Sequence, residues 1–233
     1  NAPALMHALA LLTPPAAGSS PALDAMNEKS SANCFLIGWN GVFAWTLRPW
    51  IRAIIPLSGE LPLHGIYGRV DVKRQGSIAL RCNMIPGELL DEIAEHFRAS
   101  LPNEAGAFIL WNSTTNAFRV VYPHVIEATP SRLHYETVRP EPDEHIVADI
   151  HSHGHSQPYW SPTDDRDDAH QTVFSVVIGN LKRTEKTGNY TVRFCSRGVY
   201  HTLSLSIFTK TETLTFQGNK KESPVSFYVP ETP

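Results

Sequence analysis

Two histidines and one aspartate carry the clearest chemical signal in this sequence of 233 residues. His151 and His153 are separated by one residue at the end of the apolar run Ile146–Ile150, and Asp164 follows after a loop. Side chains at positions i and i+2 of a strand point to the same face, so both imidazoles can reach one ion. Two neutral imidazoles and a carboxylate suit catalytic Zn²⁺ and leave the fourth tetrahedral position to water. The sequence therefore predicts one Zn²⁺ per chain, bound by His151, His153 and Asp164.

A His-x-His pair alone is weak evidence for a metal, because packing or exposure explains most such pairs. The aspartate makes the pattern more specific. The segment Ser161–Asp164 also predicts a helix start, with Ser161 as N-cap, Pro162 at the first helical position and an acid at the third. The two interpretations are compatible, because a helix start is a rigid platform that directs Asp164 back toward the histidines. Three further acids are expected to favour the N-terminal end of this helix: Asp165, Asp167 and Asp168.

Four other side chains lie near the pair in the sequence. Asp149 shares the strand face of the imidazoles, and it is equally well interpreted as a hydrogen-bond partner of a ligand histidine or as a surface acid. His155 is expected to be a bystander in the loop. Tyr159 and Trp160 either wall a channel for the extended tail of a substrate or simply pack within the loop.

These residues belong to a stretch of mixed helical and strand character. Gly87–Ala99 has helical periodicity, with acids early and Arg98 late. Apolar runs of strand character follow at Ala107–Trp111, Ala117–Ile126, Ile146–Ile150, Val173–Ile178, Tyr190–Cys195 and Val199–Phe208. The alternation predicts an α/β (α+β) domain over residues 84–208.

The rest of the chain carries no obvious chemistry. We expect residues 1–33, rich in Ala, Pro and Ser, to form a flexible leader and residues 34–80 to form a small β-rich module. In that module Asn40-Gly41 predicts a tight hairpin turn, and Ile51–Leu57 and Gly65–Val72 are strand candidates. Residues 209–233 form a polar tail, whose last apolar patch (SFYV) is interpreted as an extra strand or a docking segment.

Charge and composition exclude several classes of partner. The formal net charge of −3 and the pI near 6.4 give no electrostatic reason to expect nucleic acid or an anionic membrane. No apolar run approaches the roughly 18–20 residues of a membrane span. Cys34, Cys82 and Cys195 are too scattered for a disulfide framework or a thiolate metal site, and we expect buried thiols in a cytoplasmic protein.

The stretch HSHGHSQPYWSPTD, from His151 to Asp164, resembles the JAMM motif of the MPN+ (Mov34/PAD-1) metalloproteases at every defining position. Members of that family also carry a glutamate upstream, after a helix and at the start of a strand, and Glu104 occupies this place. The resemblance implies a curled β-sheet flanked by helices, with Zn²⁺ as cofactor. It also implies that Glu104 is the general base and that Ser161 donates a hydrogen bond to the oxyanion.

The same resemblance implies cleavage of peptide or isopeptide bonds at the C-terminus of a ubiquitin-like protein. More loosely, the chain is similar to the A proteins of bacterial PRTRC systems, which are linked to mobile elements. The segment Glu127–Asp143 departs from the family because it is short where many members carry a helix and a substrate-gripping insertion. Two alternatives remain: a metallopeptidase acting on a small carrier-protein conjugate, and a non-catalytic MPN scaffold.

Overall fold

The computed structural model describes residues 31–38, 41–57, 77–203, 207–217 and 226–228. The chain divides into two compact units, residues 1–81 with 223–233, and residues 82–222. Within the described residues, no helix has both the length and the apolarity needed to cross a membrane.

The first unit contains a five-stranded sheet in the order β1-β2-β3-β4-β14. Its strands are β1 (Ala32–Gly38), β2 (Gly41–Arg48), β3 (Ile51–Pro56), β4 (Ser77–Leu80) and β14 (Ser226–Tyr228). The first four strands are antiparallel neighbours, whereas β14 pairs with β4 in parallel. Phe43, Trp45, Ile51 and Ile78 are buried in this unit.

The predicted hairpin forms, but its turn is not the predicted one. Gly41 pairs with Gly38 and already belongs to β2, so it is a strand residue, while Asn40 lies outside the described residues. This register leaves two residues between the strands, the length of a tight hairpin loop. The strand predicted at Gly65–Val72 also lies outside the described residues. The SFY of the apolar tail patch forms β14.

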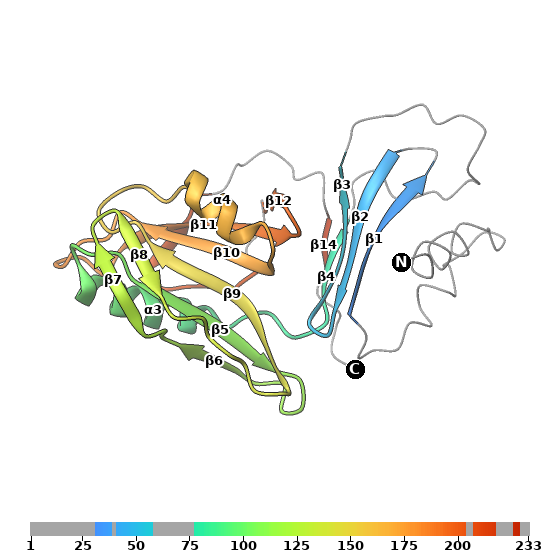
Figure 1. The fold of residues 1–233 in the computed structure, drawn as a ribbon. Coiled ribbons are helices and arrows are strands. Elements are labelled where there is room, and N and C mark those ends of the chain that lie inside the picture. Colours follow the sequence, from blue (N-terminus) through green and yellow to red (C-terminus); the bar gives the residue numbers. More distant parts are fainter. Residues whose placement is uncertain (1–30, 39–40, 58–76, 204–206, 218–225, 229–233) are drawn as a thin grey trace. The chain divides into compact units, whose positions relative to one another are not determined.

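The second unit contains a seven-stranded sheet in the order β12-β11-β10-β9-β5-β6, with β13 pairing beside β11. Its strands are β5 (Gly106–Asn112), β6 (Phe118–Val121), β9 (Glu144–Ser152), β10 (Thr172–Gly179), β11 (Gly188–Ser196), β12 (Val199–Thr202) and β13 (Leu214–Phe216). The helices α3 (Gly87–Ser100) and α4 (Pro162–Asp168) accompany it. This is an α+β fold, as predicted. Figure 1 shows α3 behind the strands, with α4 beside β10.

The amphipathic pattern of α3 explains its place in the fold. Leu90, Ile93, Ala94 and Phe97 recur at helical spacing and are fully buried, while Glu95 on the other face is exposed. The helix ends at Ser100, and the chain then turns directly into β5. Because β5 pairs antiparallel with β9, the start of β5 lies beside the end of β9.

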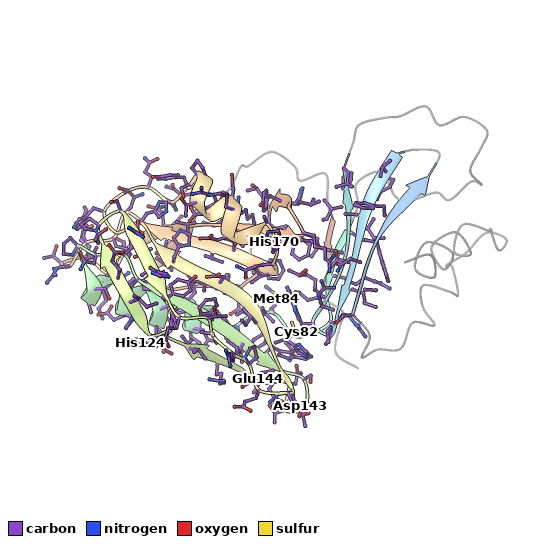
Figure 2. The ribbon with its side chains drawn as sticks, in the orientation of Figure 1. Cys82, Met84, His124, Asp143, Glu144 and His170 are labelled. Atoms are coloured by element: carbon purple, nitrogen blue, oxygen red, sulfur yellow. The ribbon has the colours of Figure 1, made fainter. Side chains whose placement is uncertain are left out.

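The connection between β9 and β10 shapes the edge of the sheet where β9 ends. These two strands are parallel neighbours, and parallel neighbours require a crossover. The crossover, residues 153–171, contains α4 and returns the chain to the start of β10. Glu144 lies at the other end of β9 (Figure 2). It accepts two hydrogen bonds of 2.6 Å from Arg119 of β6.

A separate two-stranded hairpin covers the beginning of β5. It consists of β7 (Val125–Thr129) and β8 (Arg132–Tyr135), and β8 was not predicted. A Cβ added at Gly106 would lie 3.1 Å from Leu133 and 3.3 Å from Tyr135, so the absence of a side chain at Gly106 lets the hairpin approach. The first part of the segment Glu127–Asp143, in which the sequence departs from its family, thus forms most of this hairpin.

Candidate metal centre

The two histidines and the aspartate lie together at the end of β9. His151 is in the strand, His153 directly follows it, and Asp164 is in the first turn of α4. The Nε2 atoms of the two histidines are 3.3 Å apart, and His151 Nε2 is 3.5 Å from Asp164 Oδ1. One ligand atom from each of the three residues lies within 4.8 Å of the others.

Backbone pairing holds both histidines in place. His151 lies in the β9–β10 ladder, and the His153 N–H donates to the Ile178 carbonyl of β10 at 2.8 Å. Ser152, between them, is fully buried, and its Oγ accepts a hydrogen bond from the Ala105 N–H at 3.0 Å. The Ser152 N–H in turn donates to the Ala105 carbonyl at 2.9 Å. These bonds hold Ala105, which follows Glu104, against Ser152, which lies between the two histidines.

The helix start delivers Asp164, as the capping-box prediction requires. The Ser161 N–H donates to Asp164 Oδ2 at 2.5 Å, and the Asp164 N–H donates to Ser161 Oγ at 3.3 Å. One carboxylate oxygen of Asp164 therefore caps the helix while the other faces His151. The Ser161 hydroxyl accepts in the cap, so its own proton remains free to donate.

Glu104 has an environment that suits a general base. It lies in the loop before β5, and its N–H donates to the Thr129 carbonyl of β7 at 2.9 Å. Partial burial, reinforced by the negative charge of Asp164, raises the pKa of Glu104 to about 7. A carboxyl with a pKa near the operating pH is well matched to accepting and returning a proton.

Burial has the opposite effect on the histidines. It lowers the pKa of His151 and brings the pKa of His153 to about 4, in the latter case reinforced by the neighbouring His151. Both imidazoles are therefore neutral at neutral pH, which is the form that binds a metal. In a tetrahedral zinc site with bonds of about 2.0–2.1 Å, ligand atoms lie about 3.3–3.5 Å apart. The two shortest distances in this cluster have these values.

All five sequence-predicted site residues line one cavity of about 690 Å³. They are Glu104, His151, His153, Ser161 and Asp164. The hairpin tip and β8 form a second wall, from Pro130 to Tyr135, and Tyr159 a third. Tyr159 is 55% exposed and packs edge-on against the His153 ring, with the ring centroids 4.4 Å apart.

Asp149, His155 and Trp160 each had alternative interpretations from the sequence, and the structure favours one for each. Asp149 is buried, so it is no surface acid; its Oδ1 lies 3.5 Å from the Tyr135 hydroxyl, and burial raises its pKa to about 7. The expectation for His155 is met, because its Nδ1 lies 2.8 Å from the Leu181 carbonyl and it is not in the metal cluster. Trp160 packs over Arg193 rather than lining the cavity.

Arg193 of β11 was not predicted as a site residue from the sequence. It is 4% exposed and binds Asp165 and the buried Asp168, both on α4. The expectation that Asp168 favours the helix N-terminus is wrong, because Asp168 is the last residue of α4. A charged residue within the apolar run Tyr190–Cys195 is a signal that could have indicated this pairing, since buried arginines need partners.

Comparison with known families places this domain in a family. Residues 86–195 match the family model for prokaryotic homologs of the JAB domain. They form a JAB/MPN domain. The family includes zinc metallopeptidases and also inactive members. No curated protein matches the chain, and the similarity to PRTRC proteins stays a prediction.

Proposed function

We propose that the JAB domain is a zinc-dependent peptidase that cleaves peptide or isopeptide bonds at the C-terminal tail of a ubiquitin-like protein. The observation that carries the proposal is the single cavity lined by the candidate base, the three candidate metal ligands and the candidate oxyanion donor. An inactive scaffold has no need to keep this complete set in one cavity. A role in a mobile-element-linked system belongs to the same proposal.

His151, His153 and Asp164 would hold the zinc, since they supply two neutral imidazoles and a carboxylate at fitting distances. When bound, zinc lowers the pKa of water toward about 7 and polarises the scissile carbonyl. The Asp164 carboxylate is already oriented by the cap of α4. The chain therefore needs little rearrangement at this ligand to accept the metal.

Glu104 is the proton carrier of the reaction. Its carboxylate accepts the proton of the attacking water and passes it to the nitrogen of the departing amine. A pKa raised to about 7 favours both halves of this task, because the group then accepts and releases a proton at similar cost. The paired segments around Ala105 and Ser152 keep Glu104 beside the histidines.

Ser161 contributes the hydrogen bond that stabilises developing negative charge on the carbonyl oxygen. Its hydroxyl proton is free, and the residue lines the same cavity as Asp164. A hydrogen-bond donor of this kind is typically worth about 2.7–4 kcal/mol in the transition state. Because Ser161 is the N-cap of α4, its hydroxyl oxygen is held in place before the reaction begins. No conformational entropy is then lost in ordering it during the reaction.

The hairpin gives the cavity a form that suits an extended peptide. Arg132–Tyr135 of β8 line it, and β8 has only β7 as a partner among the described strands. A substrate tail can pair with the free edge of β8 through backbone hydrogen bonds, while small side chains fit between β8 and Tyr159. The Gly-rich C-terminus of a ubiquitin-like protein meets this requirement.

A specific observation favours a second candidate, a peptidase that releases a small group from a carrier protein. Arg132 and Arg166 both line the cavity. Either guanidinium would attract the free carboxylate of an amino-acid leaving group. Substitution of both arginines by Gln would abolish release of such a group but leave cleavage of an isopeptide bond, which has no carboxylate at that position, largely intact.

The metal is tested first, by elemental analysis of the purified protein. We expect one Zn²⁺ per chain, and none after His151 and His153 are both changed to Ala. Zinc content that is unaffected by the double substitution would exclude this ligand set.

The substrate is tested with tail variants of a ubiquitin-like protein. Replacement of the final Gly residues by Leu or Phe is expected to block cleavage, because bulky side chains do not fit beside Tyr159 and β8. The globular part of the substrate should still bind the Glu104→Gln enzyme. If bulky tails are cleaved as fast as glycine tails, the narrow-channel proposal is wrong.

A further inference from the structure

The helix α4, which carries Asp164, has little intrinsic stability. It has seven residues, and helices much shorter than about 12–15 residues are marginal without tertiary contacts. Four of the seven are aspartates, which are weak helix formers. Asp168 ends the helix, where the helix dipole disfavours negative charge. The position of α4 must therefore come from contacts outside it.

Arg193 provides those contacts from β11. Its Nη2 and Nε donate to Asp168 Oδ2 at 2.7 and 3.2 Å, and its Nη1 donates to Asp165 Oδ1 at 2.5 Å. Arg193 and Asp168 are each 4% exposed, so this ion pair is shielded from water. One guanidinium thereby binds both the first and the last turn of α4.

Two aromatic rings complete the anchor. The Arg193 guanidinium carbon lies 4.9 Å from the centre of the Trp160 ring and 4.3 Å from that of Tyr200 in β12. The Tyr200 hydroxyl also donates to the Asp165 carbonyl. Trp160 immediately precedes Ser161, so the chain is fixed to Arg193 just before the N-cap as well as within the helix.

We propose that Arg193 is a positioning residue that sets Asp164 and Ser161 relative to His151 and His153. Both residues lie between the fixed points Trp160 and Asp165. Their side chains contact each other, and Asp164 faces His151, but within the described part of the chain no hydrogen bond joins either residue to Arg193. The inference rests on the proposed function only in requiring that His151, His153 and Asp164 bind zinc.

The test is Arg193→Met, with Zn²⁺ and Co²⁺ affinity measured on the full chain by competition with a chelator. Loss of groups that orient metal ligands typically weakens metal binding about 10–100-fold, and this range is expected here. The visible absorption of bound Co²⁺, which reports the symmetry of its ligands, is expected to change as well. Arg193→Lys should recover only part of the affinity, because an ammonium cannot span both carboxylates as the guanidinium does.

The matched control is Arg98→Met. Arg98 is also buried in the second unit and binds Glu95 and the Lys186 carbonyl, and no hydrogen bond among the described residues joins it to α4. We expect this variant to lose thermal stability while its zinc affinity stays within about twofold of the wild type. If Arg193→Met does not fold, Asp168→Asn, which removes only one charge from the same pair, provides the measurement with the same expected direction.

The outcomes separate the two proposals. Wild-type protein that binds no zinc would overturn the proposed function. Wild-type protein that binds zinc, together with Arg193 and Asp168 variants of unchanged affinity and unchanged Co²⁺ spectrum, would overturn the positioning role alone. Equal losses in Arg98→Met and Arg193→Met would also overturn it, because general loosening of the unit would then explain both.

Discussion

At Glu104, burial and the charge of Asp164 act in the same direction on the pKa and raise it to about 7. Glu104→Gln preserves the shape of the side chain and removes the proton acceptor. We expect zinc content and fold to be retained and turnover to fall by about 10²–10⁴-fold, the usual contribution of general-base catalysis. Single-turnover cleavage by protein of equal zinc content measures this. Undiminished cleavage would mean that another group is the base.

The raised pKa of Glu104 also predicts how the stability of the metal-free protein depends on pH. The folded-state pKa of about 7 exceeds the ordinary value of 4.5 because the folded protein disfavours the ionised carboxylate. The contribution of protonated Glu104 to the free energy of unfolding is therefore fully present below pH 4.5 and is lost as the pH rises through 7. Glu104→Gln should therefore raise the melting temperature of the metal-free protein more at pH 8 than at pH 5. Thermal melts in a chelator check this, and a gain independent of pH would contradict it.

Apart from Glu104, which was assigned from the family resemblance, the site residues predicted from sequence share one property, which is that their spacing is local. His151 and His153 are two positions apart on a strand, and Ser161 and Asp164 form a helix start. Arg193 could not be assigned in this way, because its acidic partners come from a different element and no spacing rule connects them. Long-range charge pairing is decided by the packing of elements.

At the scale of elements, the loop between β9 and α4 depends on a residue of β10. A Cβ added at Gly179 would lie 2.3 Å from the Ser156 carbonyl oxygen and 2.7 Å from the Pro158 nitrogen, both backbone atoms. Gly179→Ala must displace the loop that joins His153 to Ser161. We expect a loss of about 1–3 kcal/mol in the free energy of unfolding and weaker zinc binding.

Gly188→Ala is the control for this change. It adds the same methyl group on the neighbouring strand, but there the nearest atoms are the flexible side-chain ends of Leu181 and Leu214, at 2.8 and 2.9 Å. Its zinc affinity should match the wild type. Zinc titrations of both variants decide the matter, and equal affinities in the two would show that the loop tolerates the displacement.

Helices and strands were predictable from sequence to different degrees. The apolar runs gave most strands of the second unit, and the spacing of Leu90, Ile93 and Phe97 gave α3. β8 was missed because its residues, Arg132–Tyr135, include two polar side chains and lack a continuous apolar run. It is a strand because β7 pairs with it and Gly106 leaves room for it.

At the scale of the whole molecule, the proposed metal ligands, the proposed base and the Arg193 anchor of α4 all belong to the unit of residues 82–222. A ligand that binds only the folded state stabilises it by about 4 kcal/mol at a concentration 1,000 times its Kd. Removal of zinc by a chelator should therefore increase hydrogen exchange in this unit and leave β2 and β3 unchanged. The variant with both His151 and His153 changed to Ala should show no response to the chelator, and a response there would point to zinc bound elsewhere.

The parallel pairing of β14 with β4 also bears on the order in which the protein is made. Ser226 pairs with Ser77, so the first unit lacks its last strand until the ribosome has synthesised the whole of the second. The second unit has all its described strands once Phe216 has emerged. During that interval β4 presents an unpaired edge, the kind of surface on which nascent chains associate wrongly. The unit of residues 82–222 is thus expected to mature first, and the N-terminal sheet to be completed last.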